Sequence, residues 1–209
     1  LSVQDAERAT EAAPIQNGTD LGLRFNQNTL GDLTTGLFAD QTLTGKAFQQ
    51  RLGQLFGGLE LASAPSDDEV TEEESTIQFR DTKPVYFTID GDSLTITVRG
   101  KEWTTPENSY RKKMNITARY RLSSDGGVPQ LLREGDVEVL PSGHEPGEAI
   151  PIRTQVIANA IRDQFESGFP QSLIPAEQSA ESLMGAGSSM LRLTQLDLIG
   201  DWMVVGYSR

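Results

Sequence analysis

Apolar and polar residues alternate along the middle of the chain, and this period of two constrains the fold more than any other feature. From residue 113 to residue 122 every even position is apolar and every odd position is polar or basic. Shorter alternating stretches lie at 77–79, 85–89 and 94–98. Because successive side chains of a strand point to opposite faces, each stretch predicts a strand that is buried on one face and exposed on the other. Together with a returning strand that carries Val139, they predict an antiparallel meander.

Turn residues divide the predicted strands into hairpins. Asp90-Gly91-Asp92 separates two of the meander strands and predicts a hairpin turn there. A second hairpin is predicted from 191 to 207, with its turn at Gly200-Asp201. The apolar parity slips between Leu193 and Leu196, which predicts a β-bulge in the first strand of this hairpin.

The hydrophobic period changes to that of a helix between residues 151 and 168. Pro151 suits the first helical turn, and Gly168 followed by Pro170 ends the helix. The stripe predicted to face the core consists of Val156, Ile157, Ala160, Ile161 and Phe165.

Two shorter helices are predicted before the meander, after a short strand at 21–25. Asn28 is expected to cap the first helix and Thr44 the second, which should end at Gly57-Gly58. Their predicted buried residues are Leu30, Leu33, Leu37 and Phe38 in the first helix and Phe48, Leu52, Leu55 and Phe56 in the second.

This order of elements predicts an α+β domain over residues 21–209. It consists of an antiparallel β-meander sheet, with one long core helix and an N-terminal helical pair on one face, and a closing C-terminal hairpin. We expect all strands to belong to a single sheet. Residues 1–20 are predicted to form a flexible N-terminal arm, and the stretch at about 63–74 an acidic loop.

The charge of the chain argues against one class of partner. The net charge is −12, and six carboxylates lie between Asp67 and Glu74 without a basic residue among them. A chain this acidic, with no concentrated basic face, is repelled by phosphate backbones. We therefore expect no nucleic-acid partner.

The composition excludes several kinds of site. The chain has no cysteine, which rules out disulfides and thiolate chemistry. No apolar run is long enough for a membrane span, so none is expected in this segment. Gly185-Ala186-Gly187-Ser188 lacks the lysine of a phosphate-binding loop, and no cofactor is predicted. The chain begins at Leu1 rather than at a methionine, from which we expect it to be a segment of a longer protein.

His144 is the one histidine, and it lies in a loop rich in proline and glycine. Glu145 or Glu148 could orient it as a general base. The alternative is a loop residue without catalytic role, which we favour because the sequence assigns it no nucleophile. No catalytic residue is predicted.

Three further charged clusters have a structural explanation beside a functional one. Asp90 and Asp92, with the carboxylates of 67–74, could attract calcium, but a turn and solvation explain them as well, and no metal site is predicted. Glu134 and Asp136 could act as paired carboxylates, but cross-strand pairing with Lys113, Arg119 and Arg121 is the simpler interpretation. The same pairing would explain the basic residues 111–113, which could otherwise form an anionic-ligand site.

The predicted arrangement resembles that of tubular lipid-binding proteins and related small bacterial lipoproteins. The likeness rests on the helix at 151–168, the meander at 77–139 and the hairpin at 191–207. The stretches Phe79–Pro84 and Asp201–Tyr207 are also similar to uncharacterised bacterial envelope proteins, including planctomycete ones. The resemblance implies an extracytoplasmic or cell-envelope location. It also implies a cleft between helix and sheet for an apolar ligand, lined by Phe87, Ile116, Val156, Ile157, Ile161 and Phe165.

Three hypotheses about function follow. The first is a non-catalytic binding or interaction domain of a larger bacterial protein, with an apolar small molecule as its ligand; the alternative for the six lining residues is that they fill the core. The second is a structural module that contacts a protein partner, which a filled core with an exposed hydrophobic patch would favour. The third is an enzyme of unrecognised class, which a cleft with converging charged groups would favour.

Overall fold

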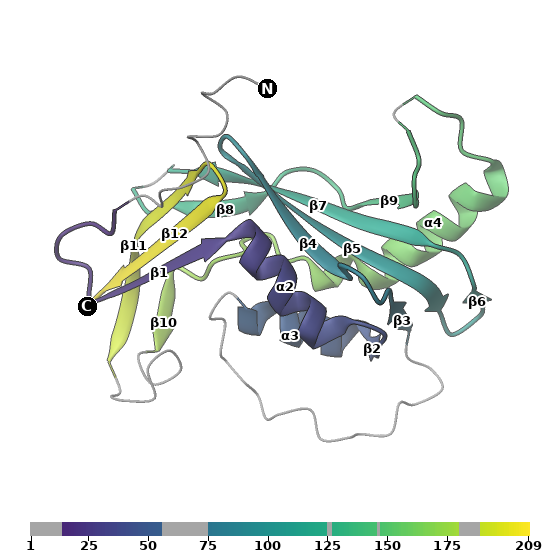
Figure 1. Ribbon diagram of the computed structural model, residues 1–209, viewed down its shortest axis with the longest axis horizontal. Helices are drawn as coiled ribbons and strands as arrows, with labels where there is room; N and C mark the ends of the chain where they lie inside the picture. The colour runs from purple at the N-terminus through teal and green to yellow at the C-terminus, as the bar shows by residue number, and fades with distance from the viewer. Residues whose placement is uncertain (1–13, 56–74, 125–126, 146, 180–188) are drawn as a thin grey trace.

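The computed structural model describes residues 14–55, 75–124, 127–145, 147–179 and 189–209. They form an α+β fold of two antiparallel sheets and three α-helices (Figure 1). The smaller sheet has the order β1-β12-β11-β10, with bounds Leu21–Asn26, Trp202–Ser208, Met190–Ile199 and Glu177–Ser179. The helices are α2 (Gln27–Phe38), α3 (Gly45–Leu55) and α4 (Ile152–Phe165), and a 3-10 turn, η1 (Glu166–Gly168), follows α4. The predicted single sheet is therefore wrong.

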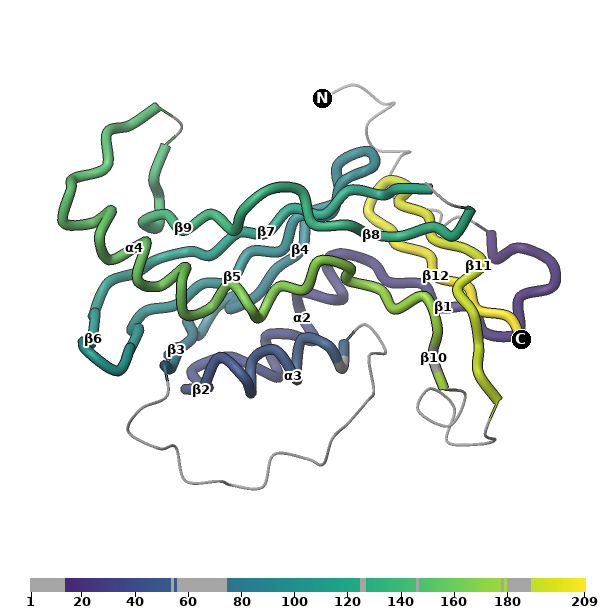
Figure 2. Tube along the Cα trace, turned by 180° about the vertical axis from the view of Figure 1, so that it is seen from behind, coloured from purple at the N-terminus to yellow at the C-terminus, as the bar shows by residue number. Residues whose placement is uncertain are grey.

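The larger sheet is the predicted meander with short additions. Its main path is β2-β3-β5-β7-β8, with bounds Thr42–Thr44, Thr76–Phe79, Ser93–Thr104, Met114–Ser123 and Gln130–Arg133. Three more strands pair at its sides: β4 (Val85–Asp90) and β6 (Ser109–Tyr110) with β5, and β9 (Glu138–Pro141) with β7. Figure 2 shows the chain after α4 running along this sheet to β10.

The meander confirms the prediction from alternation. β4 and β5 pair from Val85↔Val98 to Asp90↔Ser93, so Gly91 and Asp92 make the turn, with Gly91 at a φ of 59°. In β7 the even positions from Met114 to Tyr120 are fully buried. The returning strand is interrupted, because Gly135 with a φ of 71° separates β8 from β9. Each half of β7 therefore has a different partner.

Helix α2 exists where it was predicted, but its predicted cap and half of its predicted stripe are wrong. The N-cap is Asn26, whose side chain accepts a hydrogen bond from the Asn28 N–H at 3.0 Å. Leu33 and Leu37 are 52% and 37% exposed. The inward positions are Leu30, Gly31, Thr34 and Phe38.

Thr34 faces inward because it completes the edge of a strand. Among the described residues, β5 is the one strand that pairs with β4, and no described strand pairs with the other edge of β4. The Thr34 hydroxyl donates to the Val85 carbonyl at 2.6 Å, and the Gln27 side-chain oxygen accepts from the Ile89 N–H at 2.9 Å. Helix α2 thus satisfies backbone groups that an open edge would expose.

The other two helices follow their predicted caps more closely. Thr44 caps α3, since its hydroxyl accepts from the Ala47 N–H at 3.1 Å. Phe48, Leu52 and Leu55 are buried as predicted, whereas Phe56 and Gly57-Gly58 lie outside the described residues. Pro151 is the N-cap of α4, and η1 ends at Gly168.

The predicted stripe of α4 is wrong at its N-terminal end. Val156 is 61% exposed, and the buried positions are Thr154, Ala158, Ile161 and Phe165. The face of α4 that is buried is therefore not the face with the most apolar side chains. A threonine and an alanine face the sheet while the larger Val156 faces solvent.

The closing hairpin confirms its predicted turn and bulge. The register of β11 and β12 shifts between Leu193 and Gln195, and Gly200 in the turn has a φ of 58°. The short strand β10 was not predicted. It pairs with β11 through residues 177–179, which carry no apolar alternation.

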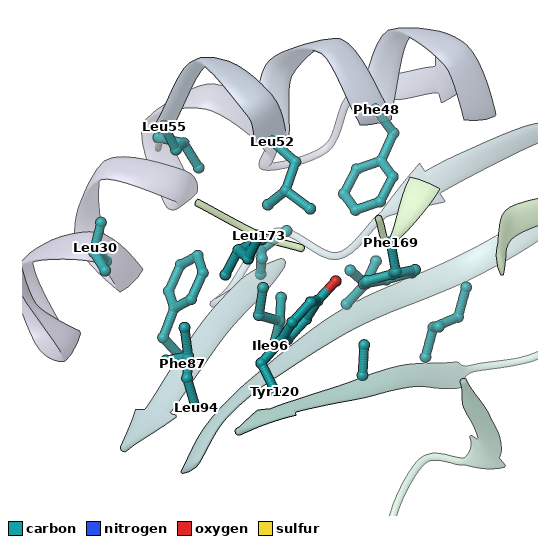
Figure 3. Packing of buried hydrophobic residues seen from close by; sticks show 14 of the residues in the cluster. Leu30, Phe48, Leu52, Leu55, Phe87, Leu94, Ile96, Tyr120, Phe169 and Leu173 are labelled. Carbon is teal, nitrogen blue, oxygen red and sulfur yellow. The ribbon is translucent and has the colours of Figure 1, made fainter. Parts of the chain in front are cut away.

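One hydrophobic core connects both sheets and the helices. Figure 3 shows the segment carrying Phe169 and Leu173 between α3 and the larger sheet, where Ile96 and Tyr120 lie. Phe48 of α3 packs on Phe169 with ring centroids 5.7 Å apart. Among the described residues, no helix is both long and apolar enough to cross a membrane.

Candidate functional site

The residues predicted to line an apolar cleft do not all lie together. Phe87, Ile116, Ile161 and Phe165 belong to the common core and are at most 4% exposed. The Phe165 ring packs edge-on against Trp103, with centroids 5.5 Å apart. Ile157 and Val156 lie outside this group: Ile157 is partly buried against the core, and Val156 faces solvent. A ligand between helix and sheet would have to displace the buried four, and the apolar-ligand hypothesis stays a prediction.

A polar groove opens at the beginning of α4 instead. It has a volume of about 370 Å³ and lies between the strand β6 with the two residues after it and the first turns of the helix. Figure 2 places β6 and the start of α4 at the same end of the molecule. We call it the cationic groove; its lining residues are Ser109, Tyr110, Arg111, Lys112, Arg153, Thr154 and Ile157.

Local sequence explains why basic side chains gather there. β6 is only two residues long, and it pairs with Trp103 and Thr104 after a turn closed by Thr105 and Asn108. Residues 111–113 then bridge to β7 outside either strand. On the opposite wall, the first turn of α4 contains no acidic residue and Pro151 provides no side-chain cap. The lining itself therefore contains no carboxylate, but Glu102 of β5 lies beside it and accepts a hydrogen bond from the Ser109 hydroxyl at 3.1 Å.

The cations of the groove are incompletely neutralised. Lys112 Nζ donates to the Thr154 hydroxyl over 2.5 Å, a neutral partner. Arg111 lies 3.4 Å from the Glu102 carboxylate, but its side chain is 86% exposed, and such pairs contribute little. Arg153 is exposed and forms no ion pair with any residue of the described ranges. The groove is therefore locally positive in a chain whose net charge is −12.

A second groove, of about 270 Å³, shares Lys112 and Thr154 with the first and is otherwise lined by Pro141 of β9 and by residues of the loop before α4. His144 lies in it, with Nδ1 3.4 Å from Glu148 Oε2. Glu148, one of the two glutamates considered for the general-base hypothesis, therefore lies within ion-pair distance of the imidazole. Ser142 lines the same groove, yet in the part of the chain that the structure describes no hydrogen bond joins its hydroxyl to the ring. The general-base hypothesis therefore gains an orienting carboxylate but no activated nucleophile.

The remaining charged clusters have structural roles where they are described. Arg121 lies 3.3 Å from Glu134, which confirms the predicted cross-strand pairing for that carboxylate, and 3.8 Å from Asp92 in the turn after β4. The pairing predicted for Asp136 was wrong, because Asp136 forms no ion pair with any described residue. The partner predicted for Arg111 was wrong, because Arg111 pairs with Glu102 of β5. The carboxylates of 67–74 lie outside the described residues. Within the described ranges, no group of three acidic or histidine side chains could hold a metal ion.

Sequence reasoning missed the second wall of the cationic groove. Arg153 and Thr154 were assigned to a helix without a functional role, and they are separated from Lys112 by about 40 residues of chain. The first turn of α4 has an arginine and no acidic residue, but the first turn of α3 has the same pattern with Lys46, so this pattern alone could not identify the groove. No protein-family model and no curated protein matches this chain in sequence.

Proposed function

We propose that this chain is a non-catalytic binding domain that holds its ligand through a negatively charged group in the cationic groove. The observation that carries the proposal is the lining of that groove, which contains Arg111, Lys112 and Arg153 with the Thr154 hydroxyl and no carboxylate of its own. Guanidinium, ammonium and hydroxyl groups are the side chains that bind carboxylates and phosphates.

The surroundings of the groove support an anionic ligand despite the charge of the whole chain. Charges on exposed groups are screened over about 8 Å at physiological ionic strength, so a ligand in the groove responds mainly to the nearby charges, which are the three cations that line it and the Glu102 carboxylate beside Arg111. Pro151 leaves the start of α4 without a side-chain cap, and the positive end of the helix dipole adds to the same field.

A titration with succinate, a small dicarboxylate, tests this proposal. We expect saturable shifts of the backbone amide signals of 109–112 and 153–157 in ¹H–¹⁵N spectra, weakened by added salt because the contacts are ionic. The double variant Lys112→Ser/Arg153→Ser should lose these shifts.

The matched control is Lys46→Ser, which removes an exposed lysine from the first turn of α3. This variant should bind succinate as the parent chain does, and thermal unfolding should show that all variants fold. Shifts scattered over the surface, or shifts that persist in the double variant, would contradict an anion site in this groove.

A further inference from the structure

Resting on the function proposed above, we infer that the ligand is an acidic polypeptide segment that also carries apolar side chains. Its carboxylates would contact Lys112 and Arg153, and its apolar side chains would cover Ile152 and Val156. The inference comes from two kinds of surface that meet at the beginning of α4: the cationic groove and an exposed apolar strip.

The apolar strip consists of Ile152 and Val156, which are 80% and 61% exposed. They are four residues apart and therefore lie above one another on the same face of the helix. Both belong to the first two turns of α4, where the groove also lies. Isolated exposed apolar residues are ordinary, but two neighbours on one helical face beside a binding groove form a continuous contact surface.

Helical geometry joins the strip to the groove through Arg153. With 3.6 residues per turn, residue 153 lies between the face of Ile152 and Val156 and the face of Ile157. Ile157 lines the groove and is partly buried against the core. A ligand that reaches from Lys112 across Arg153 would therefore arrive next at the apolar strip.

A polypeptide fits this combination better than a small anion does. A small carboxylate or phosphate would be satisfied by the groove and would leave Ile152 and Val156 in water. A segment of acidic residues interrupted by apolar ones supplies both contacts, with charge complementary to Lys112 and Arg153. Electrostatic complementarity fixes the register, and burial of the apolar pair supplies the additional affinity.

Fluorescence anisotropy with two synthetic peptides tests the inference on the full chain. One labelled peptide is glutamate-rich with two leucines one helical turn apart, and its counterpart has serines in place of the leucines. We expect the leucine peptide to bind about tenfold more tightly, as burial of two apolar contacts allows. The variant Ile152→Ser/Val156→Ser should remove this difference and leave succinate binding unchanged.

The matched control is Leu33→Ser on α2, since Leu33 is 52% exposed on another helix; it should preserve the preference for the leucine peptide. Equal binding of the two peptides by the parent chain would overturn the inference and leave the groove as an anion site only. Self-association that Ile152→Ser/Val156→Ser abolishes, seen by analytical ultracentrifugation, would also overturn it, because the occupant would then be a second copy. If succinate fails to bind as well, the proposed function falls with the inference.

Discussion

Gln27 binds Asp201 through two hydrogen bonds: its side-chain Nε2 donates to Asp201 Oδ1 at 2.7 Å, and its backbone N–H donates to the Asp201 carbonyl at 2.9 Å. Gln27 is the first residue of α2, and Asp201 lies in the turn between β11 and β12. Because the Gln27 side-chain oxygen also accepts from the Ile89 N–H of β4, one side chain connects the smaller sheet to the larger.

We therefore predict that Gln27→Ala lowers the free energy of unfolding by about 1–2 kcal/mol, since it leaves the Ile89 N–H without its partner and removes the bond to Asp201. Urea denaturation provides the measurement. Asp201→Asn is the matched control, because it keeps an acceptor oxygen, and it should change stability by less than about 0.5 kcal/mol. If Gln27→Ala and Asp201→Asn lowered the free energy of unfolding equally, the hydrogen bonds of the Gln27 side chain would not explain its effect on stability.

Two glycines should respond oppositely to alanine. A Cβ at Gly100 would lie 2.3 Å from Cζ2 of the buried Trp103 ring, whereas a Cβ at Gly36 in α2 would meet nothing within 4 Å. Gly100→Ala should destabilise by about 1–3 kcal/mol through overpacking, and Gly36→Ala should stabilise by about 0.5–1 kcal/mol through helix propensity. Thermal and urea unfolding of both variants give the test, and a neutral Gly100→Ala would contradict the close approach of Trp103.

The Tyr120 hydroxyl predicts a loss of stability in alkali. It is buried, and among the described residues it has no hydrogen-bond partner. Burial raises the pKa of the Tyr120 phenol above its ordinary value, although Arg133 opposes this in part. The folded state therefore holds the phenol proton more tightly than the unfolded chain does. The contribution of this proton to the free energy of unfolding is complete below about pH 10, the ordinary tyrosine pKa, and it decreases as the pH rises above that value.

Tyr120→Phe separates this effect from that of the other tyrosines. At neutral pH the variant should be as stable as the parent or up to about 1 kcal/mol more stable, because it removes a buried polar atom without a partner. Above about pH 10, the ordinary tyrosine pKa, the parent should lose stability relative to the variant. Unfolding curves at several pH values would show this, and parallel pH profiles of the two proteins would contradict it.

An aspartate scan along α4 should distinguish its two faces. Ile161 is fully buried, and Val156 is 61% exposed. Ile161→Asp should unfold the chain or destabilise it by more than about 4 kcal/mol, because an unpaired charge would enter the core. Val156→Asp should keep the fold with a change of about 0.5 kcal/mol or less. Circular dichroism of the two variants decides whether the helix has the orientation described above.

Local patterns were sufficient for the longer strands, although not for the short strands β2, β6 and β10. The β4–β5 hairpin, the burial parity of β7 and the bulge of β11 were all predicted, because each depends on residues that are close in sequence. The orientation of the helices was harder to predict. Thr34 of α2 faces inward because its hydroxyl donates a hydrogen bond to the Val85 carbonyl, 51 residues away. The hydrophobic period of a helix contains no information about so distant a partner.

The candidate site depended on the same kind of distant pairing. The basic residues 111–113 were visible in the sequence, but their partner could not be assigned. Lys112 meets Thr154 only because α4 packs against β9, which itself pairs with the beginning of β7. A threonine in the buried face of a helix gives no sequence signal of contact with a lysine.

The pairing of β1 with β12 has a consequence for how the chain is made. Leu21 lies opposite Tyr207 in the smaller sheet, so an early strand has its partner among residues synthesised long after it. During translation, β1 must remain unpaired while the meander, whose strands are near neighbours in sequence, can already assemble. Completion of the smaller sheet is therefore a late event, and a nascent chain stalled before residue 202 would expose the edge of β1 to aggregation.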